Sequence, residues 1–234
     1  MTRVVVVSLQ TLLEDALASP HKNLAGDVRA IEDLFSPENR KVLKQHFPGI
    51  FAFLSFHPGA DSGITSYIRT GTLSSDAGQN IMALFTFDSR ATAPTVLRDQ
   101  SFRSWLALTT TVHPSYTLVR SMFKDPVVLN FPGVIFFEDF LQEQNPIYIH
   151  ISDSSNEDAV RQQMRSLFAL ANKAYQSSWE TGNNFLDLFA QALQKERIDY
   201  ERGRDVSLRE WFVNAFRILS DKTSDIVSIV SLFK

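Results

Sequence analysis

The sequence predicts an α/β fold in which helices flank a four-stranded mixed sheet. Short, almost wholly apolar segments of strand length alternate with segments of helical periodicity, and two of the apolar segments are close enough to form a hairpin. Beyond residue 178 the pattern is helical throughout. We therefore expect an N-terminal, mainly helical segment (1–46), an α/β domain (47–178) and an all-helical C-terminal extension (179–234).

The N-terminal segment opens with an apolar run that leaves two interpretations open. Val4–Ser8 has the composition of a short buried strand, but with Leu9, Leu12 and Leu13 it also fits the face of a helix. Helical spacing returns in Asp27–His46, interrupted by a serine and a proline that are typical of a new helix start. We expect two short helices there.

The first half of the α/β domain has the order strand, helix, strand. Both apolar segments lack polar alternation, which is typical of strands buried on both faces. Between them, Asp61 or Ser62 can begin a short helix that ends before Gly71, and we expect a polar turn over Ser74–Asn80. The two predicted strands are Ile50–Phe56 and Ile81–Phe87.

The second half of the domain predicts a helix, an antiparallel hairpin and a long helix. His113-Pro114-Ser115 precedes the first helix, and Ser154 or Ser155, followed by two acidic residues, begins the long one. The predicted segments are the helix Tyr116–Phe123, the strands Val134–Phe137 and Ile147–Ile151, and the helix Asp153–Tyr175.

Composition excludes several classes of chemistry. The chain has no cysteine, which excludes disulfides, thiolate catalysis and cysteine-ligated zinc. A net charge of −3 argues against nonspecific nucleic-acid binding, which needs a basic surface. No apolar run approaches the roughly 18 residues of a membrane span, and none fits a signal peptide. We expect a cytoplasmic protein that binds neither nucleic acid nor membrane, without a cofactor or a metal.

This order of elements resembles the thioredoxin fold over Phe47–Tyr175, roughly half of the chain. The closest local match is Phe131-Pro132-Gly133 before the first hairpin strand, and the resemblance implies a structural cis-proline at Pro132. Without cysteine the chain cannot be a thiol-dependent oxidoreductase, so the resemblance implies a redox-inactive binding or structural member. An arrangement similar to glutathione transferases, with helices after the thioredoxin-like domain, stays open.

Four polar residues lie in loops at predicted strand or helix ends: His57, Asp88, Arg90 and His113. Ligands gather at the carboxyl ends of strands in open α/β sheets, so these side chains could bind a polar or anionic ligand. Ordinary turn and surface residues explain them more simply, and we favour that reading. No metal-ligand spacing and no phosphate-binding glycine motif supports a familiar site.

Two further residues could face one another across the predicted hairpin. Glu138 follows its first strand, and His150 lies on the second. A carboxylate beside a histidine can act as a general base. An ordinary cross-strand polar pair is the interpretation we favour.

The C-terminal extension carries an apolar stripe that either covers the sheet or forms an interaction surface. Aromatic anchors of this kind concentrate at interfaces. We therefore predict a non-enzymatic interaction or regulatory module that self-associates or binds a protein partner. The alternative is an enzyme or small-ligand-binding protein that uses the strand-end residues. The candidate surface residues are Trp211, Phe212, Phe216, Ile229 and Phe233.

Overall fold

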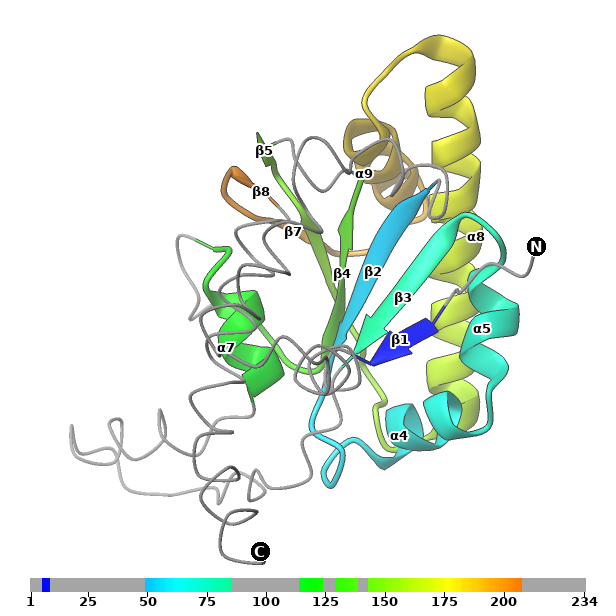
Figure 1. The fold of residues 1–234 in the computed structure, drawn as a ribbon, viewed down its shortest axis with the longest axis vertical. Helices are drawn as coiled ribbons and strands as arrows, with labels where there is room; N and C mark the ends of the chain where they lie inside the picture. The colour runs from blue at the N-terminus through cyan, green and yellow to red at the C-terminus, as the bar shows by residue number, and fades with distance from the viewer. Residues whose placement is uncertain (1–5, 9–48, 86–113, 124–128, 139–142, 208–234) are drawn as a thin grey trace, which may run out of the picture.

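The computed structural model describes residues 6–8, 49–85, 114–123, 129–138 and 143–207. These residues build a mixed six-stranded sheet with the order β1-β3-β2-β4-β6-β7, and a separate two-stranded sheet, β5-β8 (Figure 1). The strands are β1 (Val6–Ser8), β2 (Ile50–Ser55), β3 (Ile81–Phe85), β4 (Gly133–Phe137), β5 (Glu143–Gln144), β6 (Ile147–His150), β7 (Glu201–Arg202) and β8 (Val206–Ser207). The helices are α4 (Ser62–Arg69), α5 (Thr72–Ala77), α7 (Pro114–Arg120), α8 (Glu157–Thr181) and α9 (Phe185–Lys195).

The four predicted strands lie side by side at the centre of the sheet. β2 runs parallel to β3 and antiparallel to β4, with Ala52 opposite both Ala83 and Phe136. β4 and β6 form the expected antiparallel pair, with Val134 opposite Ile149. The prediction of an α/β fold built on these four segments is confirmed, and one more strand joins the sheet at each edge.

The N-terminal alternative is settled for the three residues that the structure describes there. β1 pairs in parallel with β3, with Val6 opposite Ala83 and Ser8 opposite Phe85. This part of the apolar run is therefore a strand. It is a strand because it pairs with residues 77 positions further along the chain (83 − 6), and no local sequence pattern reveals such a pairing. The two helices expected within residues 9–48 lie outside the described residues.

The segment after residue 178 differs from the all-helical extension that we expected. α8 continues to Thr181, across the predicted boundary, and α9 packs its apolar side chains into the same core as the sheet. β7 then pairs with β6, placing Tyr148 opposite Glu201. Two-residue strands are too short to give a recognisable alternation, which explains why the sequence did not reveal β7 and β8.

The connection between β2 and β3 contains two helices rather than one helix and a turn. α4 is confirmed, and Gly71 follows its last turn with a φ of 76°, a left-handed conformation that favours glycine. The polar turn expected over Ser74–Asn80 is wrong for its first part, because α5 occupies Thr72–Ala77. Leu73 and Ala77 are buried at helical spacing, and the polar residues between them concealed that pattern.

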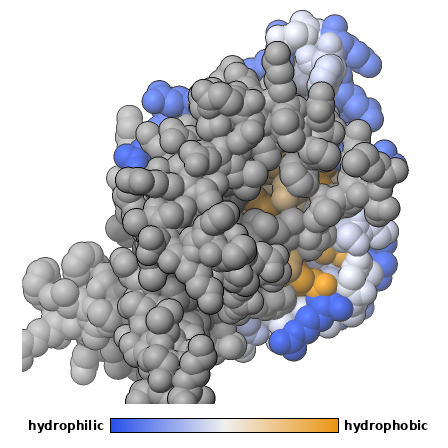
Figure 2. Space-filling view, viewed as in Figure 1, coloured by the Kyte–Doolittle hydropathy of each residue, from blue (hydrophilic) through white to orange (hydrophobic). Residues whose placement is uncertain are grey.

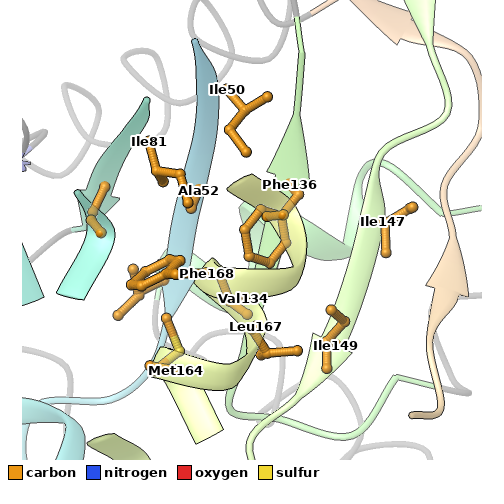
Figure 3. Packing of buried hydrophobic residues seen from close by; sticks show 14 of the residues in the cluster. Ile50, Ala52, Ile81, Val134, Phe136, Ile147, Ile149, Met164, Leu167 and Phe168 are labelled. Atoms are coloured by element: carbon orange, nitrogen blue, oxygen red, sulfur yellow. The ribbon is translucent and has the colours of Figure 1, made fainter. Parts of the chain in front are cut away.

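One face of the sheet forms the main hydrophobic core with α4, α5, α8 and α9. Alternate strand residues such as Ile50, Ala52 and Phe136 point toward Met164 and Phe168 of α8 (Figure 3). All five of these residues are fully buried. Because burial of a phenylalanine contributes on the order of 2 kcal/mol, this helix–sheet layer is a major source of stability.

The opposite face of the same strands is buried as well. Phe51, Phe53, Ile135 and Tyr148 alternate with the residues of the main core, and each is at most 2% exposed. α7 lies on this side of the sheet, away from α5 and α8 (Figure 1). Burial on both faces explains why the central strands read as unbroken apolar runs.

The described residues that are visible in Figure 2 present a largely polar surface. Where these residues are visible in Figure 2, most are blue or white, and orange covers only small areas. Trp179, at 75% exposed, is the one strongly exposed large hydrophobic side chain among the described residues. Isolated apolar side chains on a surface are normal.

Within the ranges that the structure describes, no helix combines the length and the apolar character needed to cross a membrane.

Candidate functional site

The candidate site lies at the end of the sheet where β2 finishes and β4 begins. Ser55, the last residue of β2, is opposite Gly133, the first residue of β4, and Gly133 is also opposite His150 at the end of β6. The loop after β2, the helix α7, the turn before β4 and the loop after β6 therefore meet at this edge. Ligand sites in open α/β sheets occur at such strand ends.

A buried carboxylate, that of Asp61, joins three of these segments. Its Oδ2 accepts hydrogen bonds from the backbone N–H of His57 at 2.7 Å and from the hydroxyl of Tyr116 at 2.9 Å. Its Oδ1 accepts a bond from the hydroxyl of Ser154 at 2.7 Å. Asp61 is only 5% exposed, so these neutral donors replace the water that a carboxylate otherwise needs.

Asp61 occupies the residue before α4 without capping the helix. The first helical N–H groups, those of Gly63 and Ile64, instead donate to the backbone carbonyl of Ser154 at 2.9 and 3.3 Å. A Cβ at Gly63 would lie 2.7 Å from the backbone of Asn156. The glycine therefore permits the close approach of α4 to the loop after β6, and the Asp61 side chain is left to bind elsewhere.

His57 is held in one tautomer by its own loop. Its Nδ1 accepts the backbone N–H groups of Gly59 at 3.0 Å and Ala60 at 3.1 Å, so the ring proton lies on Nε2. The residue is 4% exposed. The histidine therefore shapes the turn through Nδ1, and this nitrogen is not available to remove a proton from a substrate.

An aromatic cluster adjoins the Asp61 carboxylate through Tyr116. The ring of Phe131 lies 4.5 Å from that of Tyr116 and 5.7 Å from that of Tyr148, measured between centroids. Burial, and then the charge of Asp61, raises the pKa of both tyrosine hydroxyls well above the usual value. Both groups therefore stay protonated and act as donors, Tyr116 to Asp61 and Tyr148 to the Asn130 carbonyl at 2.7 Å.

The turn before β4 is closely packed. The Phe131–Pro132 peptide bond is cis, in agreement with the expectation for Pro132, which is buried. A Cβ at Gly133 would lie 2.3 Å from the ring of Tyr148, so the glycine makes room for that ring. The Pro132 carbonyl accepts the N–H of Ile151 at 2.9 Å, which fixes the turn to the end of β6.

The structure places only some of the predicted site residues. His57 lies at this edge, whereas Asp88, Arg90 and His113 lie outside the described residues. α7 begins at the residue after His113, and the Ser115 hydroxyl donates to the Phe56 carbonyl at 3.0 Å. The candidate surface in the C-terminal stripe also lies outside the described residues: Trp211, Phe212, Phe216, Ile229 and Phe233.

The suggested pairing of Glu138 with His150 is wrong. His150 is opposite Gly133, whereas Glu138 lies beyond the other end of β4, where its N–H donates to the Gln144 side chain at 2.6 Å. The Nδ1 of His150 lies 2.9 Å from the Pro132 carbonyl, which makes it a donor to that oxygen. The register of the hairpin separates the two residues along its length.

Sequence reasoning missed the residues at the centre of the cluster. Asp61 and Ser154 were predicted as candidate helix starts, and Tyr116 as the first residue of a helix. The bonds that unite them span 55 and 93 residues along the chain. No spacing within a single segment could reveal such contacts.

A second buried carboxylate lies away from this edge, between α4, α5 and α8. The side chain of Asp76 is 4% exposed, and its Oδ1 lies 2.7 Å from the Nε of Arg165. Its Oδ2 accepts the hydroxyl of Tyr67 at 3.0 Å and lies 3.9 Å from the Nε of Arg161. Burial and then Asp76 raise the pKa of Tyr67 well above the usual value, so this hydroxyl also stays protonated.

Neither carboxylate belongs to a cluster with metal-ligand character. In the described ranges, no group of three or more histidine, aspartate or glutamate residues is arranged to hold a metal ion. Comparison of the chain with protein-family models, with curated proteins and with solved structures found no match.

Proposed function

We propose that this chain is a non-enzymatic, thioredoxin-like interaction module in which the sheet end is a structural clasp. One observation carries the proposal: the Asp61 carboxylate accepts three hydrogen bonds from three separate segments. A catalytic base needs a lone pair directed at a substrate proton. Here the carboxylate oxygens face protein donors, and the same bonds hold the surrounding loops together.

The strand arrangement supports the likeness to the thioredoxin fold. Three parallel strands in the order β1-β3-β2 continue into the antiparallel strands β4 and β6. α4 and α5 connect β2 to β3, and the long helix α8 follows β6. The absence of cysteine from the sequence makes such a domain redox-inactive, which leaves binding as the role of the scaffold.

Self-association through the C-terminal apolar stripe is the interaction that we propose. The mass of the full chain in solution, measured by light scattering, should be at least twice the 26.5 kDa of one copy. Replacing Trp211 and Phe216 together by alanine should give a folded monomer, because truncated aromatic anchors lose most of an interface's affinity. Trp179→Ala is the matched control and should keep the assembly. A wild-type monomer at all concentrations would contradict this part of the proposal.

A ligand site at the same sheet edge is the second candidate function. The carboxyl ends of the parallel strands β2 and β3 lie together, and α7 starts against Phe56, one residue before His57. In the sequence, Asp88 follows the end of β3 by three residues and His113 directly precedes α7. Native mass spectrometry of the purified chain tests this second function. A co-purifying small molecule that is lost in both Asp88→Ala and His113→Ala would favour this function over the first.

A further inference from the structure

We propose that Arg120 binds an oxyanion, which is the carboxylate or phosphate group of a small ligand. The site lies at the end of the sheet where β2 finishes and β4 begins. Arg120 lies in the last turn of α7, and its guanidinium carbon is 5.2 Å from the centroid of the Phe131 ring. This cation–π contact holds the guanidinium in place over the turn that leads into β4. The inference goes beyond the proposed function because it holds whether or not the chain self-associates.

Within the described part of the chain, no carboxylate forms an ion pair with Arg120. Arg161 and Arg165 face Asp76, and Arg202 faces Asp187 at 2.7 Å. Arg120 forms no ion pair with any described residue, and its buried Nε has no hydrogen-bond partner there. Buried donors of charged groups are normally paired, so this N–H is a position where an acceptor is expected.

A second polar atom without a partner lies near the same turn. Ser55 is fully buried, and its hydroxyl forms no hydrogen bond within the described part of the chain. Ser55 is directly opposite Gly133 in the sheet, so its side chain points to the same face as a Cβ at Gly133 would. The Tyr148 ring packs against that position and also contacts Phe131. Ser55 and Arg120 are therefore both neighbours of the Tyr148–Phe131 ring pair, Ser55 through the strand position opposite Gly133 and Arg120 through the Phe131 ring.

The neighbouring groups favour an oxyanion over other ligands. The guanidinium presents parallel N–H donors that match carboxylate and phosphate geometry, and a serine hydroxyl can donate a further bond. The Asp61 carboxylate accepts its hydrogen bonds from His57, Tyr116 and Ser154, and within the described residues it forms no ion pair with Arg120. A cationic ligand would be repelled by the guanidinium.

Isothermal titration of the full chain tests the proposal, with inorganic phosphate and acetate as separate probes at constant ionic strength. We expect saturable binding of at least one probe, and the stronger probe identifies the ligand group. Arg120→Gln should weaken this binding about tenfold or more, because it removes charge-assisted hydrogen bonds. Arg165→Gln, which removes a paired and exposed arginine, should bind like the wild type. If neither phosphate nor acetate shows saturable binding, the proposal is overturned.

Two further variants separate binding from folding. Arg120→Lys keeps the charge but loses the planar fork, so it should bind with an affinity between those of the wild type and Arg120→Gln. Ser55→Ala should fold normally and weaken binding several-fold, because a single hydroxyl is lost. Far-UV circular dichroism verifies the fold of each variant. Wild-type affinity in a folded Arg120→Gln protein contradicts the assignment, and wild-type affinity in Ser55→Ala removes that residue from the site.

Discussion

Two buried aspartates in this molecule are satisfied in opposite ways. Asp76 lies between helices, accepts the Tyr67 hydroxyl and has the guanidinium of Arg165 at 2.7 Å. Asp61 lies at the sheet end, accepts the Tyr116 hydroxyl and is otherwise bound by neutral donors. Each aspartate accepts a tyrosine hydroxyl. The other partner of Asp76 is a charged arginine, whereas the other partners of Asp61 are a neutral backbone N–H and a serine hydroxyl.

The difference has energetic consequences. Arg165 is 53% exposed, so water and salt screen its attraction to Asp76, and loss of the arginine leaves a carboxylate that water can reach in part. The donors around Asp61 come from the loop after β2, from α7 and from the loop after β6, segments that the Gly63–Ser154 and Ser115–Phe56 hydrogen bonds also connect. Loss of Asp61 therefore removes a link between segments as well as three hydrogen bonds.

The largest expected effect is that of Asp61→Ala. It leaves three donors without their acceptor at a buried position, and we expect the free energy of unfolding to fall by about 3 kcal/mol. Urea denaturation followed by circular dichroism measures the change. Catalytic and binding residues often reduce stability, so a variant more stable than the wild type would indicate a functional carboxylate and contradict the clasp.

The next effect is that of Asp76→Ala, which removes the acceptor of the buried Tyr67 hydroxyl and the partner of Arg165. We expect a loss of about 2 kcal/mol, smaller than for Asp61→Ala, because the exposed arginine can be solvated again. The same denaturation experiment compares the two variants. If Asp76→Ala lowers the free energy of unfolding more than Asp61→Ala does, the expectation that Asp61 contributes more to stability than Asp76 is wrong.

The tyrosines predict a loss of stability in alkali. Folding raises the pKa of Tyr67 and Tyr116 above the unfolded value of 10.0. Their stabilisation is complete below about pH 10 and decreases at higher pH, because the unfolded state releases the proton first, at up to about 1.4 kcal/mol per pH unit per group.

Tyr67→Phe and Tyr116→Phe should each reduce the slope of this alkaline loss and cost about 1 kcal/mol at pH 8. Unfolding free energies measured from pH 8 to 11 test the effect in both regions. A variant that keeps the full wild-type slope would show that its hydroxyl is not a buried donor.

The smallest expected effect is that of Arg165→Gln. Because the arginine is about half exposed, we expect a loss below about 1 kcal/mol that shrinks further as salt is added. Stability in low and high salt, for this variant and the wild type, provides the measurement. A large, salt-independent loss would mean that the ion pair behaves as a buried one.

The sequence predicts the central sheet better than the candidate site. Ile50–Ser55 and Ile81–Phe85 were found because burial on both faces leaves a local apolar signature. α5 was missed because only two of its residues are buried. Asp61 could be placed at a helix start, but its role depends on Tyr116 and Ser154, which local patterns cannot bring together.

The most direct test of the clasp is a double-mutant cycle between Asp61 and Ser154, residues 93 positions apart in the chain. The unfolding free energies of Asp61→Ala, Ser154→Ala and the double variant are compared with the wild type. If the Asp61 carboxylate binds the loop after β6, the double variant should lose less stability than the sum of the two single losses, by about 1 kcal/mol. Additivity within about 0.3 kcal/mol would contradict the account, because it would mean that the two side chains do not interact.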